Sequence, residues 1–166
     1  MLTGKAFKFG DDVSTDLIIP GRFLHLRSNL PELAKHVLED ADATFAQRVK
    51  QGDFVVGGSN FGLGSSREHA PIVIKMAGVS AVLAKSFARI FFRNAINIGL
   101  PVLVCDTDLI EDGDKLEVDL SKGTIKDMTN KAELGFSPMP DIMLRILNEG
   151  GLVPYIQKHK DLVLEG

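Results

Sequence analysis

The chain has 166 residues, of which 45% are hydrophobic and 25% charged, and its formal net charge is −3. This is ordinary globular composition, and the length predicts a single domain over residues 1–166. The weak negative charge argues against a nucleic-acid partner. No apolar stretch reaches the ~20 residues of a membrane helix, and the N-terminus has no signal-peptide pattern, so we expect a soluble cytoplasmic protein without a membrane partner.

Cysteine content limits the cofactor chemistry of the chain. Cys105 is the only cysteine, which excludes an intramolecular disulfide. An iron–sulfur cluster held by cysteines needs several thiolates, so this chain alone is not expected to bind one. The four histidines show no metal-binding spacing such as H-E-x-x-H. We therefore expect no metal site in this chain.

The first third of the chain predicts short elements. Residues 4–9 alternate in polarity as a strand does, and a Gly-Asp-Asp turn follows them. Residues 30–38 predict a helix that Asn29 caps, with Pro31 in its first turn. Residues 44–49 predict a second short helix.

The middle of the chain predicts tightly coupled strands and helices. We expect a buried strand at 53–57, a glycine-rich loop at 58–66, a helix at 66–77, a strand at 79–84, a helix at 86–98 and a strand at 101–105. This order predicts parallel βαβ pairing with right-handed crossovers.

The last third changes character. The alternating residues 115–120, followed by Gly123 and another short extended run, predict a β-hairpin. Helices are expected at 140–148 and 152–158. The sequence therefore predicts an α/β fold with a parallel βαβ core and an added antiparallel hairpin.

The glycine-rich loop is the candidate binding site. Gly62 and Gly64 precede Ser65, Ser66 and Arg67 at the start of a predicted helix. A helix N-terminus carries unpaired N–H groups, and glycines let a ligand approach the backbone. Two hydroxyls and a guanidinium at that end suit a carboxylate or a phosphate.

The loop matches a helix-capping pattern but not the common nucleotide-binding and nucleophile patterns. Ser65 and Glu68 fit a capping box, in which Ser65 is the N-cap of the helix. The nucleotide-binding patterns G-x-x-x-x-G-K-[ST] and G-x-G-x-x-G do not fit, because Arg67 stands at the third glycine position of the latter. The nucleophile-elbow pattern G-x-S-x-G is also missing.

Three segments carry a resemblance to a known family. GSSREHA, at 64–70, resembles the signature of the aconitase swivel domain and its stand-alone relatives. Residues 85–101 and 9–23 are similar to the small subunits of 3-isopropylmalate dehydratase and homoaconitase. The resemblance covers nearly the whole chain, and it implies a swivelling β/β/α domain.

The resemblance also implies a mechanism. In this family a [4Fe–4S] cluster on a large partner subunit acts as a Lewis acid, and the small subunit supplies a serine base. Carried over, Ser65 is the base that removes the proton next to a carboxylate. Ser66 and Arg67 bind the substrate, with Arg67 holding a carboxylate. The substrate is a hydroxy di- or tricarboxylate, which the enzyme isomerises by dehydration and rehydration.

A second stretch resembles the segment that carries a substrate-binding arginine. In it Arg27 would bind a carboxylate, for which a planar, permanently charged guanidinium is well suited. Phe23, Leu24 and Leu26 would form a specificity loop that contacts an apolar substrate group. If Arg27 instead meets the variable group of the substrate, a tricarboxylate such as homocitrate fits better than isopropylmalate.

Further residues receive supporting roles at most. Thr15 and Asp16 match a Thr-Asp pair of the family that orients the site, although turn capping explains them equally. His69 stands in the motif without touching the substrate. Four residues of the predicted helix 86–98 share a face that is either solvated or turned toward a partner: Arg89, Arg93, Asn94 and Asn97.

The resemblance leaves several functions open. The leading one is the small subunit of a hydro-lyase acting on isopropylmalate in leucine biosynthesis. The alternatives are the small subunit of homoaconitase or of a citramalate or dimethylmalate hydro-lyase, a non-catalytic carboxylate- or phosphate-binding module, and a structural assembly subunit. Without its partner, the isolated chain is expected to expose a surface that can drive homo-oligomer formation.

Overall fold

A seven-stranded mixed sheet is the centre of the computed structural model, which describes residues 1–159. The strand order in the sheet is β4-β3-β2-β1-β5-β6-β7. The strands are β1 (Leu2–Lys8), β2 (Phe54–Val56), β3 (Ala81–Ala84), β4 (Val102–Val104), β5 (Lys115–Asp119), β6 (Thr124–Asp127) and β7 (Glu133–Gly135).

Strand β1 joins a parallel half of the sheet to an antiparallel half. It pairs parallel with β2, with Ala6 opposite Phe54, and antiparallel with β5, with Gly4 opposite Leu116. Strands β2, β3 and β4 are parallel, and β5, β6 and β7 are antiparallel. The predicted parallel core and hairpin are confirmed, whereas β7 was not predicted.

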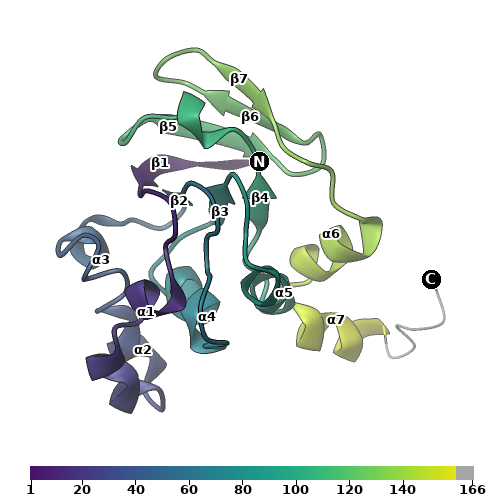
Figure 1. Ribbon diagram of the computed structural model, residues 1–166. Coiled ribbons are helices and arrows are strands. Elements are labelled where there is room, and N and C mark those ends of the chain that lie inside the picture. The colour runs from purple at the N-terminus through teal and green to yellow at the C-terminus, as the bar shows by residue number, and fades with distance from the viewer. Residues whose placement is uncertain (160–166) are drawn as a thin grey trace.

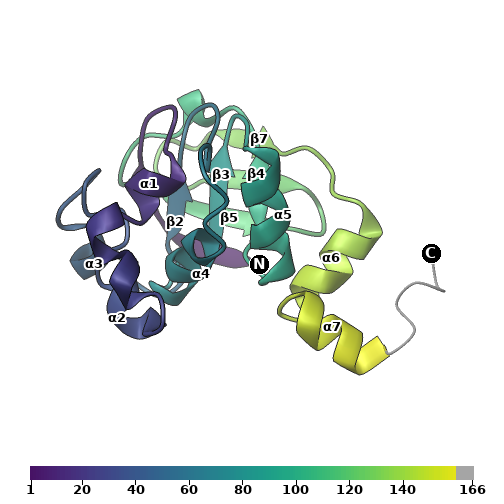
Figure 2. The ribbon, with the colours of Figure 1, turned by 60° about the horizontal axis from the view of Figure 1, so that its bottom comes forward.

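Helices cover one face of the parallel half, and the antiparallel half folds over the other face (Figure 1). Figure 2 shows α4 and α5 in front of the sheet, with α1, α2 and α3 on one side and α6 and α7 on the other. The α-helices are α1 (Thr15–Ile18), α2 (Leu30–Ala34), α3 (Phe45–Arg48), α4 (His69–Met76), α5 (Arg89–Asn97), α6 (Asp141–Asn148) and α7 (Leu152–His159), and the 3₁₀ helices are η1 (Gly21–Leu26) and η2 (Thr107–Leu109).

Two hydrophobic cores make the fold three-layered. Neighbouring strand residues point to opposite faces. Phe7 and Val55 therefore pack with the helices, while Ala6, Phe54 and Leu83 pack between the two halves of the sheet. This β/β/α layering confirms the fold class that the resemblance implied. The prediction of one domain over 1–166 stays a prediction, since its last seven residues lie outside the described range.

Helix α4 begins later than the sequence predicted. It starts at His69, with Glu68 as an N-cap that makes no side-chain capping bond, so the predicted start at residue 66 and the Ser65 capping box are wrong. The physical reason is that the Ser65 carbonyl is already occupied. It accepts hydrogen bonds from Arg67 N at 2.8 Å and from Thr15 Oγ1 at 2.9 Å, so it does not start a helical ladder. None of the helices in residues 1–159 combines the length and apolar character that a membrane crossing needs.

Candidate active site

The connections that leave β2 and β3 lie side by side. Phe61 and Phe87 form an isolated parallel bridge. Phe61 N donates to Ser86 O at 3.0 Å, and Ala88 N donates to Phe61 O at 2.9 Å. The glycine-rich loop is therefore fastened beside the start of α5, at the carboxyl ends of two adjacent parallel strands, where α/β folds bind ligands.

A cavity of about 200 Å³ opens between these two connections. Ser65 and Ser66 are exposed to solvent beside it, and Arg67 is half-buried. The lining residues are Thr15, Gly62, Gly64, Ser65, Ser66, Arg67, Ala88, Arg89, Ile90, Phe91 and Asn94. The predicted residues Ser65, Ser66 and Arg67 thus share one open cavity, and Thr15 joins them from α1.

Thr15 holds the Ser65 backbone in place. Its hydroxyl donates to the Ser65 carbonyl oxygen at 2.9 Å, and Thr15 Oγ1 lies 3.5 Å from Ser65 Oγ. Thr15 N also donates to Leu63 O at 2.9 Å. Because the Thr15 side chain is only 3% exposed, it is a fixed point against which the glycine-rich loop is positioned.

Arg67 is held at the cavity by groups of the α1 region. Its guanidinium pairs with Asp16 Oδ1 at 2.8 Å and donates to the Ile19 carbonyl oxygen. The Arg67 side chain is 20% exposed and that of Asp16 is 69% exposed. The ion pair is therefore open to solvent on its Asp16 side, where an incoming carboxylate can compete for the guanidinium.

Two glycines let the loop approach its neighbours. Gly62 has φ +84°, and a Cβ there would lie 2.2 Å from Phe91 Cγ. Gly64 has φ +107°, and its Cβ would lie 3.3 Å from Thr15 Oγ1. A side chain at either position would strain the backbone and, at Gly62, would push Phe91 out of the cavity wall.

The helix that faces the cavity with its N-terminus is α5. Ala88, Arg89 and Ile90 line the cavity, and Ala88 provides no side-chain capping bond. The first N–H groups of α5 and the positive end of its dipole therefore favour an anion in the cavity. From the sequence, this role was expected of the helix that follows Ser65, but α4 begins four residues after that serine.

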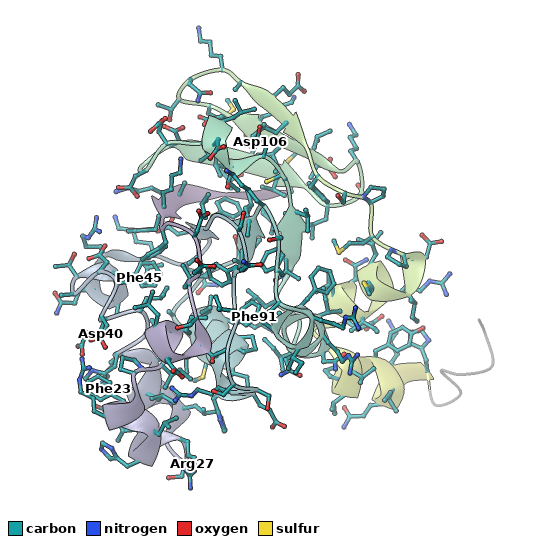
Figure 3. All side chains as sticks on the ribbon, viewed as in Figure 1. Phe23, Arg27, Asp40, Phe45, Phe91 and Asp106 are labelled. Atoms are coloured by element: carbon teal, nitrogen blue, oxygen red, sulfur yellow. The ribbon has the colours of Figure 1, made fainter. Side chains whose placement is uncertain are left out.

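The structure does not bring every predicted residue to the cavity. Arg27 is exposed at the end of η1. Figure 3 shows it at the outer end of the region formed by η1 and α2, apart from Phe91. Phe23 stacks on His36, with ring centroids 3.9 Å apart. Leu24 and Leu26 pack against the helix-side core. His69 opens α4 and does not line the cavity.

Sequence reasoning missed part of the cavity wall. Arg89 and Asn94 line the cavity, although the sequence indicated a solvated or partner-facing helix surface, and Ile90 adds an exposed apolar side chain. The signal that could have found them is the strand order. Loops after adjacent parallel strands meet at one edge of the sheet, so the start of each following helix belongs to the same site.

Metal-ligand chemistry is sparse in this chain. No group of three or more His, Cys, Asp or Glu side chains within residues 1–159 is arranged to hold a metal ion. Cys105 is buried, and burial raises the pKa of its thiol to about 12, with the charge of Asp106 adding to the effect. The thiolate that a metal or cluster needs is therefore disfavoured at this position.

Comparisons with known proteins agree with this fold. The family model of the aconitase C-terminal domain matches residues 23–107. The chain is 63% identical over 161 residues to "3-isopropylmalate dehydratase small subunit 2" of Archaeoglobus fulgidus, covering 97% of this chain and 98% of that protein. It is 58% identical over 160 residues to "3-isopropylmalate dehydratase small subunit 1" of Thermotoga maritima, covering 96% of each.

A solved structure agrees as well. A crystal structure titled as 3-isopropylmalate dehydratase from Methanocaldococcus jannaschii matches with a TM-score of 0.92 at 48% identity, covering 96% of this chain and 95% of that one. The chain belongs to the aconitase C-terminal domain family and, within it, to the group of 3-isopropylmalate dehydratase small subunits. The resemblance inferred from 9–23, 64–70 and 85–101 is confirmed.

Proposed function

We propose that this chain is the small subunit of a two-subunit hydro-lyase that interconverts 2-isopropylmalate and 3-isopropylmalate in cytoplasmic leucine biosynthesis. The observation that carries the proposal is the open cavity in which Ser65, Ser66 and Arg67 meet the N-terminus of α5. The names of relatives that are 51–63% identical over nearly the whole chain support it.

In this proposal Ser65 is the general base. An ordinary serine hydroxyl is far too weak an acid to provide an alkoxide, so its deprotonated form needs strong stabilisation. The cavity offers the α5 N-terminus and the Arg67 guanidinium as positive groups. Thr15 fixes the Ser65 backbone, so the oxygen is positioned before the substrate arrives.

Arg67 is proposed to bind a substrate carboxylate. Its guanidinium has five donors in a planar fork, which suits a carboxylate in a bidentate geometry. Asp16 holds that fork at the cavity until the substrate competes for it. Ser66, exposed beside Ser65, supplies a further hydroxyl to the same substrate end.

The substrate-bound complex requires the large subunit. The described residues of this chain do not fit an iron–sulfur cluster, because their one cysteine is buried and disfavours the thiolate. We propose that the [4Fe–4S] cluster resides on the large subunit, which closes over the cavity. The task of this chain is to hold the proton-accepting oxygen and one carboxylate.

Substrate choice is assigned to two apolar regions. The specificity loop with Phe23, Leu24 and Leu26 lies in η1, outside the cavity of the isolated chain, and Arg27 follows it. Ile90 is 52% exposed at the cavity itself and is a second candidate for contact with an isopropyl group. We propose that the loop reaches the substrate only when the large subunit brings the two together.

Reconstitution with a cluster-bearing large subunit tests the proposal. The chain alone should be inactive and colourless, and the pair should dehydrate 3-isopropylmalate. Ser65→Ala should lower kcat by roughly 100- to 10,000-fold, as expected for loss of a general base, while the pair still forms by size-exclusion chromatography. Ser59→Ala, in the same loop but outside the cavity, is the matched control.

The other functions give different results. If Ser65→Ala kept full activity in the pair, the base assignment would be wrong. If no pairing restored turnover while the chain alone bound malate-type ligands, it would be a non-catalytic carboxylate-binding module. A panel of isopropylmalate, citramalate, dimethylmalate and homocitrate separates the hydro-lyases from one another through their kcat/KM values.

A further inference from the structure

A second cavity, remote from Ser65 in its lining, collects positive charge. It measures about 500 Å³ and lies where the start of β1 meets the start of β5 and the end of α3. Its wall contains four cationic side chains, Lys5, Arg48, Lys50 and Lys115, and one carboxylate, Asp53. This concentration contrasts with the net charge of −3 of the whole chain. We call this second cavity the lysine cavity.

Two of the lysines are paired on neighbouring strands. Lys5 and Lys115 are Cα partners in the antiparallel pairing of β1 with β5, so both side chains leave the same face. Like charges directly opposite in an antiparallel pair destabilise it. An anion bound between the two side chains would offset this repulsion.

Phe7 brings a third cation to this pair. Lys5 Nζ lies 5.3 Å from the centroid of the Phe7 ring, and Arg48 Cζ lies 5.2 Å from the same centroid. The ring is buried in the helix-side core, with 2% of Phe7 exposed. Lys5 and Arg48 therefore both lie near the same fixed ring.

The carboxylate in the wall orders the backbone of two of the lysines and offsets one of the four positive charges. Asp53 is 7% exposed, and its two oxygens accept hydrogen bonds from Lys5 N at 2.9 Å and Lys50 N at 2.8 Å. It therefore holds the backbone of both residues and leaves their ammonium groups free for other partners. Within residues 1–159, Lys5, Lys50 and Lys115 form no ion pair, and Arg48 pairs with Asp42 at 2.6 Å.

We propose that the lysine cavity is a binding site for a small molecule that carries two or more phosphate groups. Its volume lies in the range of small-molecule pockets, which is about 300–1,000 Å³, and exceeds the needs of a single phosphate. Flexible ammonium groups are effective partners for the dense charge of a phosphate chain. No aromatic side chain lines the cavity, so the phosphates alone would be recognised and not an attached base.

Titration calorimetry on the full chain with sodium tripolyphosphate, at low ionic strength, tests this site. We expect one binding site per chain, with affinity that falls as salt is added. Lys50→Gln combined with Lys115→Gln should weaken the affinity by roughly tenfold or more, because two charge-assisted contacts are lost. Lys35→Gln combined with Lys158→Gln changes the net charge equally outside the lysine cavity and should leave the affinity unchanged.

Further arms separate this site from other anion binding. Arg67→Ala should keep the tripolyphosphate affinity, because Arg67 lies at the other cavity. ATP should bind as tightly as tripolyphosphate, and citrate should bind more weakly. The proposal is overturned by absence of saturable binding, by an equal loss in both lysine pairs, by loss with Arg67→Ala alone, or by citrate binding equally well.

A stability measurement distinguishes a ligand site from a structural role. Lys115→Gln removes the repulsion with Lys5, so the ligand-free protein should keep or raise its Tm while its tripolyphosphate affinity falls. A lysine kept for folding would lower the Tm when replaced. A lower Tm of Lys115→Gln would therefore contradict the phosphate-site proposal. This test is independent of the proposed role of Ser65, because the two cavities share none of their lining residues.

Discussion

The Thr15 hydroxyl donates a hydrogen bond to the Ser65 carbonyl oxygen at 2.9 Å, across 50 positions of the chain. Thr15 is almost fully buried, whereas Ser65 is exposed at the cavity. The contact therefore connects the rigid part of the fold to the residue proposed to act as base. The Thr15 hydroxyl fixes the geometry of the loop, a role that the sequence suggested for a helix cap at Ser65.

Thr15→Val tests whether this contact positions the base. Valine has the same shape without the hydroxyl, so Ser65 loses one hydrogen bond and about 1 kcal/mol of positioning energy. We expect kcat of the reconstituted pair to fall by about fivefold with little change in KM. Thr15→Ser, which keeps the donor, should restore most of the rate. An unchanged kcat in the valine variant would leave Thr15 a purely structural residue.

Arg67→Lys tests the proposed carboxylate clamp. Lysine keeps the charge but cannot reach two acceptors with a planar fork, as Arg67 does with Asp16 and the Ile19 carbonyl oxygen. We expect KM for isopropylmalate to rise roughly tenfold, the cost of one lost charge-assisted contact. Arg93→Lys, on the exposed face of α5 outside the cavity, is the matched control. Equal KM values for the two variants would contradict the clamp.

Arg27→Ala separates substrate recognition from folding. Arg27 is exposed, and its side chain makes no hydrogen bond or ion pair among the residues that the structure describes. Its removal should leave the Tm of the isolated chain within about 1 °C of the parent, as is usual for exposed sites. In the pair, KM should rise, and the panel of malate-type substrates should show whether all of them or only one is affected. A large loss of Tm would refute a role confined to the substrate.

Much of the fold was predictable because it depends on local patterns. Alternation identified β1, and apolar runs bounded by glycine and proline identified β2, β3 and β4. Asn29 does accept from Glu32 N at the start of α2, as its position suggested. Strand β7 has only three residues and was missed, since its pairing with β6 is not encoded in its own sequence.

The sequence predicted part of the cavity lining, Ser65, Ser66 and Arg67, but not the contacts that position these residues. The motif identified Ser65 and Arg67, but a capping pattern in the sequence does not show where the helix begins. A side chain 50 residues away occupies the carbonyl of Ser65, and sequence spacing does not reveal such a contact. For the same reason the place of the α5 N-terminus and of Arg89 in the cavity wall followed only from the arrangement of β2 and β3.

Gly62→Ala should destabilise the fold around the site. At φ +84° a Cβ is strained, and it would meet Phe91 Cγ at 2.2 Å. Left-handed strain and overpacking together cost about 2–4 kcal/mol. We expect a clear loss of Tm in thermal denaturation. Gly10→Ala, where a Cβ would meet nothing within 4 Å, should be close to neutral. Similar Tm values for both variants would contradict the close approach of the loop to Phe91.

Two buried carboxyl groups meet beneath the β-hairpin. Asp114 is 5% exposed and Asp127 is 1% exposed. Asp127 Oδ1 accepts from Thr129 N at 3.0 Å and from Asn130 N at 3.2 Å, whereas Oδ2 is buried and has no partner within residues 1–159. Burial raises the pKa of the Asp127 carboxyl, and the neighbouring Asp114 carboxyl raises it further.

Asp127→Asn should therefore stabilise the protein as the pH rises. Because the folded pKa of Asp127 lies above the unfolded one, its contribution is favourable at low pH and is lost as the pH rises through the folded pKa. Asparagine keeps the Oδ1 acceptor and stays neutral, so the Tm of the variant should exceed that of the parent by about 2–4 °C above that pKa, and the gap should narrow in acid. Asp119→Asn should show the opposite sign, since hydrogen bonds from Ser121 and Lys122 lower the pKa of Asp119. A pH-independent difference between parent and Asp127→Asn would show that the pKa of Asp127 is the same in the folded and the unfolded protein.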